Sequence, residues 1–178
     1  MTPKTIASFA IGPIGAAALG LISLPVVTWF FSQEDVGRMS MLQVTIGFAV
    51  LFFSLGLDQS YVREFHESDD KPLLLKMAAL PGLILLSITL LVMLIDTDAL
   101  SMWLFGISDW RLSLIVAAAV LASFVSRFLS LVLRMNERGF AYSMSQLLPK
   151  IAFLTVLGLY VLMEAHKGLT NLMIANLI

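Results

Sequence analysis

Long apolar runs alternate with short polar connections along this chain. Five runs have the length of a membrane-spanning helix, at residues 5–31, 39–57, 73–95, 112–133 and 147–163. About 20 apolar residues carry a helix across the hydrocarbon core of a bilayer. A sixth run, at residues 169–178, rises only about 15 Å and so reaches about halfway. The pattern predicts an all-α integral membrane protein, a bundle of five complete transmembrane helices plus the start of a sixth.

The longest polar segment, residues 56–71, reads GLDQSYVREFHESDDK. Because apolar runs flank it, we expect it to be a loop or a short surface helix in water. Residues 32–38 and 134–146 are read as further polar connections. Residues 101–110 are too short to span, and their aromatic side chains suit the headgroup layer.

Composition agrees with a membrane protein and excludes several other classes. The 178 residues are 59% hydrophobic and 13% charged, whereas soluble domains carry about 25% charged residues. The net charge of −1 gives no basic surface for nucleic acid. The absence of cysteine excludes disulfides, thiol catalysis and cysteine-based metal sites.

No pattern of catalytic residues is present. The chain has no P-loop, no HExxH and no nucleophile elbow, so we expect no catalytic residue, no cofactor and no bound metal. Four acidic residues in the 56–71 segment are most simply a solvated loop; these are Glu64, Glu67, Asp69 and Asp70.

The distribution of Lys and Arg predicts the orientation, since cytoplasmic connections are enriched in both. Seven lie on the side of the N-terminus: Lys4, Arg63, Lys71, Lys76, Arg134, Arg138 and Lys150. Three lie on the opposite side: Arg38, Arg111 and Lys167. We therefore expect a multi-pass protein whose N-terminus is in the cytoplasm.

The first run carries prolines and a stripe of small residues. Gly12, Ala16 and Gly20 recur every four residues, and small residues let membrane helices approach closely. Pro13 and Pro25 each remove a backbone donor and are expected to bend the helix. They fit ordinary membrane-helix prolines and a functional hinge equally well.

Polar residues also mark the second run. Gln43, Gly47 and Ser54 fall on one helical face, which we expect to look into the protein. Asp58 follows Gly56 at the end of this run, and it can cap a helix or pair with Arg63.

The fourth run holds the sharpest feature, a face made by Ser123, Arg127, Ser130 and Arg134, at spacings of 4, 3 and 4. We call it the arginine face. If Arg134 marks the membrane surface, Arg127 lies about 10 Å deeper. A charge at that depth is costly unless it faces water or a partner, although an arginine can also snorkel to the interface. The two serines favour a polar cavity. If Arg127 instead forms an ion pair, the carboxylates Asp58 and Glu64 are the first candidates for its partner.

Three stretches resemble a known family. They are GPIGAAALGLISLPVVTWFFSQEDVGRMSML, LGLDQSYVREF and LRMNERGFAYSMSQLLPK. Together they are similar to the oligosaccharide flippases of bacterial envelope polysaccharide synthesis, within the multidrug/oligosaccharidyl-lipid/polysaccharide exporter superfamily. Members usually have 12 or more spanning helices. The resemblance implies that residues 1–178 form most of an N-terminal lobe, to be completed by a C-terminal lobe or an oligomeric partner.

The resemblance also implies a substrate, a polyprenyl-pyrophosphate-linked oligosaccharide that crosses the bacterial cytoplasmic (inner) membrane among its lipids. Because such transport involves no covalent chemistry, the resemblance implies no enzyme activity. Arg127 and Arg134 would attract pyrophosphate, while Gln43, Ser123 and Ser130 would bond sugar hydroxyls. Structural or gating roles would fall to Pro13, Pro25, Gly56, Asp58 and Arg63.

Two other functions stay open. A multidrug/cation antiporter of the same superfamily would want an acidic residue deep in the first lobe, and no Asp or Glu lies inside a spanning run. A small membrane scaffold without transport activity is the other.

Overall fold

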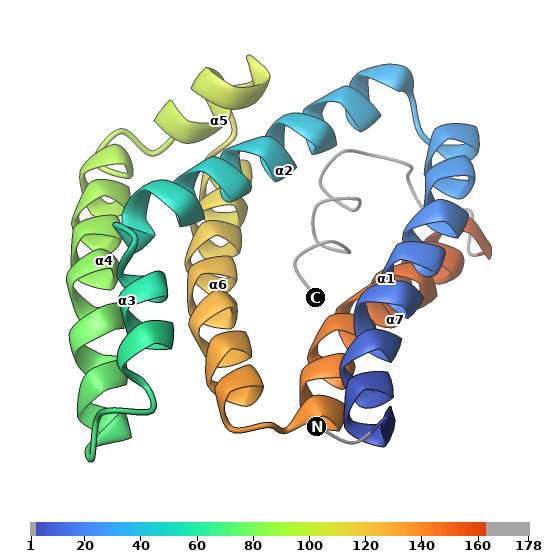
Figure 1. Ribbon diagram of the computed structural model, residues 1–178. Coiled ribbons are helices and arrows are strands. Elements are labelled where there is room, and N and C mark those ends of the chain that lie inside the picture. The colour runs from blue at the N-terminus through green and yellow to red at the C-terminus, as the bar shows by residue number, and fades with distance from the viewer. Residues whose placement is uncertain (1–2, 163–178) are drawn as a thin grey trace. The chain divides into compact units, whose positions relative to one another are not determined.

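The computed structural model describes residues 3–162, and the side chains of residues 7–159. This part of the chain forms seven helices and no strand (Figure 1). They are α1 (Pro3–Phe30), α2 (Gln33–Ser54), α3 (Leu57–Glu64), α4 (Lys71–Met93), α5 (Ala99–Phe105), α6 (Trp110–Met135) and α7 (Gly139–Leu162). Five of them, α1, α2, α4, α6 and α7, are long and apolar enough to cross a membrane. The predicted all-α membrane fold is therefore confirmed, and the run at 169–178 lies outside the described residues.

The helices group into two compact units. Within residues 3–162, one unit contains residues 3–40 and 136–162, and the other contains residues 41–135. Helix α2 begins in the first unit and continues into the second.

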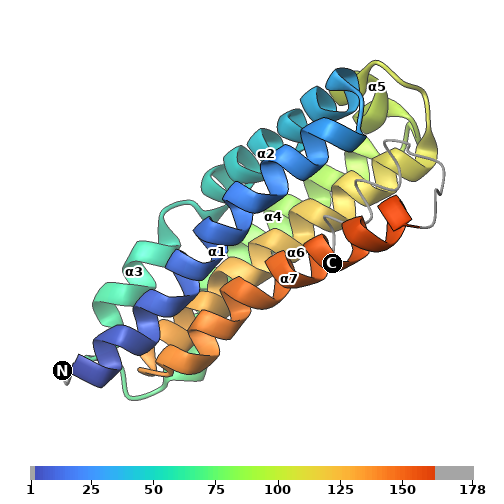
Figure 2. The same ribbon diagram turned by 90° about the vertical axis from the view of Figure 1, so that its right-hand side faces the viewer.

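In the first unit, α1 and α7 lie side by side and run in the same direction (Figures 1 and 2). Small residues allow the two helices to approach each other closely. A Cβ built on Gly12 would lie 2.5 Å from the Ser143 Cα, and one on Gly15 would lie 2.6 Å from a Leu147 methyl group. Nothing lies within 4 Å of such a Cβ on Gly20, so the predicted stripe is used at Gly12 but not along its whole length.

Also in the first unit, apolar side chains from α1, α7, the start of α2 and the residue after α1 form a cluster. Phe31 and Leu157 are buried at its centre. Five partly buried side chains pack against them: Val26, Val27, Val36, Met39 and Phe153.

Helix α7 begins earlier than the sequence pattern predicted. Residues 134–146 were expected to be a polar connection, but helical structure resumes at Gly139. A Cβ on Gly139 would come within 2.2 Å of the Ser8 hydroxyl oxygen, so this first turn already packs on α1. Pro149, the third residue of the predicted run at 147–163, is consequently the eleventh residue of the helix.

The connection between α1 and α2 is also shorter than expected. Residues 32–38 were read as a turn, yet α2 starts at Gln33. The Ser32 hydroxyl accepts a hydrogen bond from the Asp35 amide at 3.1 Å and donates one to the Asp35 carboxylate at 2.8 Å. This reciprocal arrangement satisfies a free amide at the helix start, which is why a polar run can be helical.

In the second unit, α4 and α6 run in opposite directions and pack together, with α3 beside both (Figure 1). Helix α5 is one of the two helices too short to span, as expected for residues 101–110. Its buried Ser101 amide donates to the Ser113 hydroxyl at 3.0 Å, which fixes α5 to the start of α6.

Candidate functional site

The site begins where α2 is interrupted. After Ser54 the backbone takes two consecutive left-handed conformations, at Leu55 (φ 53°) and Gly56 (φ 71°). Glycine adopts this conformation without the steric cost that a Cβ brings, whereas leucine rarely does. The two residues end α2 and redirect the chain into α3.

Helix α3 confirms one of the two alternatives predicted for residues 56–71, a short helix, but it is buried on one face and not surrounded by water. Tyr61 of this helix and Phe65, which directly follows its last residue, are buried. The helix packs against α4 and α6. Leu57, Tyr61 and Phe65 recur every four residues and so form one apolar stripe on the helix. That periodicity indicates a helix with one buried face, but the many charged residues on the other faces favoured the prediction of a segment in water.

Asp58 in the first turn of α3 pairs with Arg127 of α6. The Arg127 Nη2 and Nε donate to the same oxygen, Asp58 Oδ2, at 2.6 and 3.2 Å. The Asp58 side chain is only 9% exposed, while that of Arg127 is 38% exposed. The structure thus gives the costly charge a partner and still leaves part of the guanidinium accessible.

Both roles predicted for Asp58, capping a helix and pairing with Arg63, are wrong in the structure. Residue Gly56 occupies the N-cap position of α3, and no side chain there makes a capping hydrogen bond. The carboxylate bonds to Arg127, and Arg63, the partner first considered, is exposed on α3. Sequence spacing can place residues on one helical face, but it does not say which residues of another helix that face will meet.

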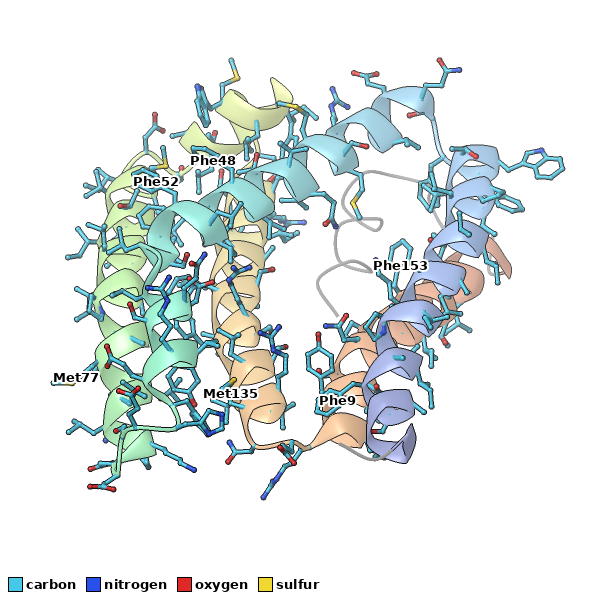
Figure 3. The ribbon with its side chains drawn as sticks, viewed as in Figure 1. Phe9, Phe48, Phe52, Met77, Met135 and Phe153 are labelled. Carbon is cyan, nitrogen blue, oxygen red and sulfur yellow. The ribbon has the colours of Figure 1, made fainter. Side chains whose placement is uncertain are left out.

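The arginine face is laid out on α6 as its spacing predicted. Ser123 and Ser130 are half-buried on either side of Arg127, and Arg134 is exposed near the end of the helix. Figure 3 labels Met135, the last residue of α6, beside that end. From Arg134 back to Arg127 the helix rises about 10 Å. The structure therefore presents one paired, partly accessible cation between two hydroxyl-bearing residues.

The prediction that Gln43, Gly47 and Ser54 of α2 all face into the protein is wrong for two of these three residues. Ser54 is buried, but Gln43 and Gly47 are exposed. The buried positions of α2 are Leu42, Val50 and Ser54. The aromatic rings of Phe48 and Phe52 stack with their centroids 6.0 Å apart, and both side chains are exposed (Figure 3).

The two prolines of α1 are exposed, and the helix runs through both without interruption. Beside Pro13, the Ser143 hydroxyl of α7 accepts a hydrogen bond from the Gly12 amide at 3.0 Å and donates one to the Ser8 carbonyl. This contact was not predicted, because the sequence pattern placed Ser143 in the polar connection at residues 134–146.

Within residues 3–162, no three His, Cys, Asp or Glu side chains lie close enough together to hold a metal ion. His66 lies in this range, beside the Phe65 ring, whereas His166 lies outside it. At the arginine face, the guanidinium of Arg127 is a group that can bind an anion, and the serine hydroxyls are groups that can bond other hydroxyls.

Comparison with known proteins assigns the chain to a protein family. A family model described as "Polysaccharide biosynthesis protein" matches residues 4–177, nearly the whole chain. No curated protein and no solved structure matches it.

Proposed function

This chain belongs to the polysaccharide biosynthesis protein family, and we propose that it flips a polyprenyl-pyrophosphate-linked oligosaccharide across the bacterial cytoplasmic membrane. The product would serve synthesis of an envelope polysaccharide such as the O-antigen of lipopolysaccharide. Transport of this kind breaks no covalent bond, so the proposal includes no enzyme activity.

The observation that supports this proposal is the position of Arg127. It is a cation within a membrane-length helix, partly accessible, and flanked by the half-buried Ser123 and Ser130. An arginine can bind phosphate oxygens through two parallel hydrogen bonds, and serine hydroxyls can bond sugar hydroxyls. Arg134, exposed about 10 Å away along the helix, would attract the anion from the membrane surface.

The proposal includes an orientation and a second set of helices. The seven-to-three distribution of Lys and Arg supports a cytoplasmic N-terminus. Alternating access requires two lobes that move against each other. We propose that a second lobe, from further polypeptide or from another copy, completes the transporter.

The antiporter alternative is weakened for a new reason. Asp58, outside the predicted spanning runs, is brought against α6 beside Arg127, so the first lobe does hold an inward acidic residue. Its carboxylate is engaged by an internal cation, however, which leaves it poorly suited to bind a cationic drug.

The test is polysaccharide export per unit of membrane-inserted protein, in a strain lacking its own flippase. Arg127→Ala should abolish export, and Arg127→Lys, which keeps the charge but not the planar fork, should retain part of it. Arg138→Ala, on an exposed residue just before α7, is the matched control and should export normally.

Replacing Arg127 alone leaves the buried Asp58 carboxylate without its partner, which can destabilise the protein. The double variant Asp58→Asn/Arg127→Leu removes both charges and should accumulate in the membrane without exporting. Normal export by this variant would refute the substrate-binding role of Arg127. The parent should also export only when the second lobe is present, so export by residues 1–178 expressed as a lone monomer would refute the two-lobe requirement.

A further inference from the structure

The geometry of the Asp58–Arg127 pair is not the one that an arginine prefers. In a fork-to-fork pair, two guanidinium N–H groups reach two different oxygens in parallel. Here both Nε and Nη2 donate to Oδ2 alone. A phosphate group offers several oxygens and more negative charge, so it can satisfy the guanidinium better than Asp58 does.

The pair is also attached to a backbone that can respond. Asp58 is the second residue of α3. This helix starts directly after Leu55 and Gly56, the two residues of left-handed backbone conformation that separate it from α2. The other end of α3 is anchored by the buried Tyr61 and Phe65, with the Lys71 ammonium 4.5 Å from the centre of the Phe65 ring. Of the two ends of α3, the one carrying Asp58 is therefore the one held to α6 by a replaceable ionic contact.

We propose that Asp58 is a resident counter-ion that a substrate phosphate replaces on Arg127, and that this exchange releases the Asp58 end of α3 from α6. The inference deepens the proposed function, on which it rests for the phosphate-bearing lipid. Occupation of Arg127 by Asp58 keeps the unloaded site electrically neutral. The phosphate that displaces Asp58 would thereby convert binding into a movement of α3 about the 55–56 break.

The first experiment measures binding to the whole protein in lipid nanodiscs. The probes are undecaprenyl pyrophosphate, inorganic pyrophosphate and, as a phosphate-free control, undecaprenol. Because Asp58 competes with phosphate, Asp58→Asn should bind both pyrophosphate probes about tenfold more tightly, equivalent to about 1.4 kcal/mol of coupling. If Asp58 instead orients Arg127 for the phosphate, Asp58→Asn will bind equally or more weakly, and the exchange is refuted.

The second experiment follows α3 itself. Because the chain has no cysteine, spin labels can be placed at Gln59→Cys on α3 and Ser126→Cys on α6, both exposed positions. Either pyrophosphate probe should lengthen or broaden this distance distribution. The control pair is Met77→Cys with Ser126→Cys, because Met77 lies on the exposed side of α4 (Figure 3), and this distance should not change.

These measurements separate the exchange from the transport function. An unchanged 59–126 distance at saturating pyrophosphate refutes the exchange even if Asp58→Asn fails to accumulate, since the labelled protein retains Asp58. Failure of both pyrophosphate probes to bind refutes it as well. Movement of α3 without polysaccharide export would leave the exchange standing and refute the flippase function.

Discussion

Gly82 illustrates how single positions determine the packing of the second unit. A Cβ on this residue would lie 2.1 Å from the Phe53 carbonyl oxygen of α2 and 2.9 Å from the Phe124 ring of α6. Three helices therefore meet at a point where only a hydrogen atom fits. In a membrane, where lipid is as apolar as leucine, such close backbone approach is a main source of helix association.

We predict that Gly82→Ala destabilises the protein by about 1–3 kcal/mol, because the new methyl group must displace backbone that cannot move aside easily. Gly47→Ala is the matched control. Nothing lies within 4 Å of a Cβ at Gly47, and alanine favours the helix, so this variant should be as stable as the parent or slightly more stable. Thermal unfolding in detergent measures both, and equal melting temperatures for the two variants would contradict the three-helix contact.

At the residue scale, Arg127 could be identified from the sequence, and its partner could be narrowed to two carboxylates, Asp58 and Glu64, of which the structure shows Asp58. Charge within an apolar run and serines at helical spacing were enough to single out Arg127. Asp58 is 69 residues away and lay in a segment that the sequence pattern assigned to water. Its position depends on the left-handed residues Leu55 and Gly56, which turn α3 back onto the bundle.

At the scale of elements, α1 and α7 are joined by contacts that a small hydroxyl-bearing residue makes possible. Ser143 approaches Gly12 so closely that its hydroxyl bonds both the Gly12 amide and the Ser8 carbonyl. These two groups are four residues apart, the spacing at which helical backbone groups normally pair with each other. The hydroxyl thereby adds an interhelical bond at the backbone next to Pro13.

We predict that Ser143→Ala weakens the α1–α7 pair by about 1 kcal/mol, since it removes the buried hydroxyl from both bonds. Ser145→Ala is the control, because its exposed hydroxyl bonds only the Tyr142 carbonyl of its own helix. Ser143→Val, which also adds bulk against Gly12, should cost more than Ser143→Ala. Thermal stability in detergent orders the variants, and a Ser145→Ala loss as large as that of Ser143→Ala would argue against the proposed contact.

The elements that could be predicted from sequence are those decided by length and apolarity. All five membrane-length helices were anticipated, because a run of about 20 apolar residues has few alternatives in a bilayer. The first turns of α2 and α7 were assigned to polar connections, and for α3 a short surface helix was only one of two alternatives, the other being a loop. Those segments are helical because of Ser32 capping, Gly139 packing and the Leu57–Tyr61–Phe65 stripe, which outweigh average polarity.

At the scale of the whole molecule, the directions of the helices agree with five crossings. If α1, α2, α4, α6 and α7 each cross once, the first and the fifth must run in the same direction. Residues 8–9, 12 and 15 of α1 do meet residues 139, 143 and 147 of α7 in increasing order. The termini of the 3–162 segment would then lie on opposite sides of the membrane.

The absolute orientation remains a prediction, which cysteine labelling can test on a chain that contains no natural cysteine. Gln33→Cys at the start of α2 and Asp96→Cys after α4 are exposed and should react with an impermeant thiol reagent in intact cells. Asp69→Cys, exposed just before α4, should react only after the cells are opened.

Labelling of Asp69→Cys after the cells are opened is the control, because it shows that this cysteine is reactive. The opposite pattern would place the N-terminus outside. Arg134 would then lie at the outer surface, and the arginine face could not receive its anionic substrate from the cytoplasm.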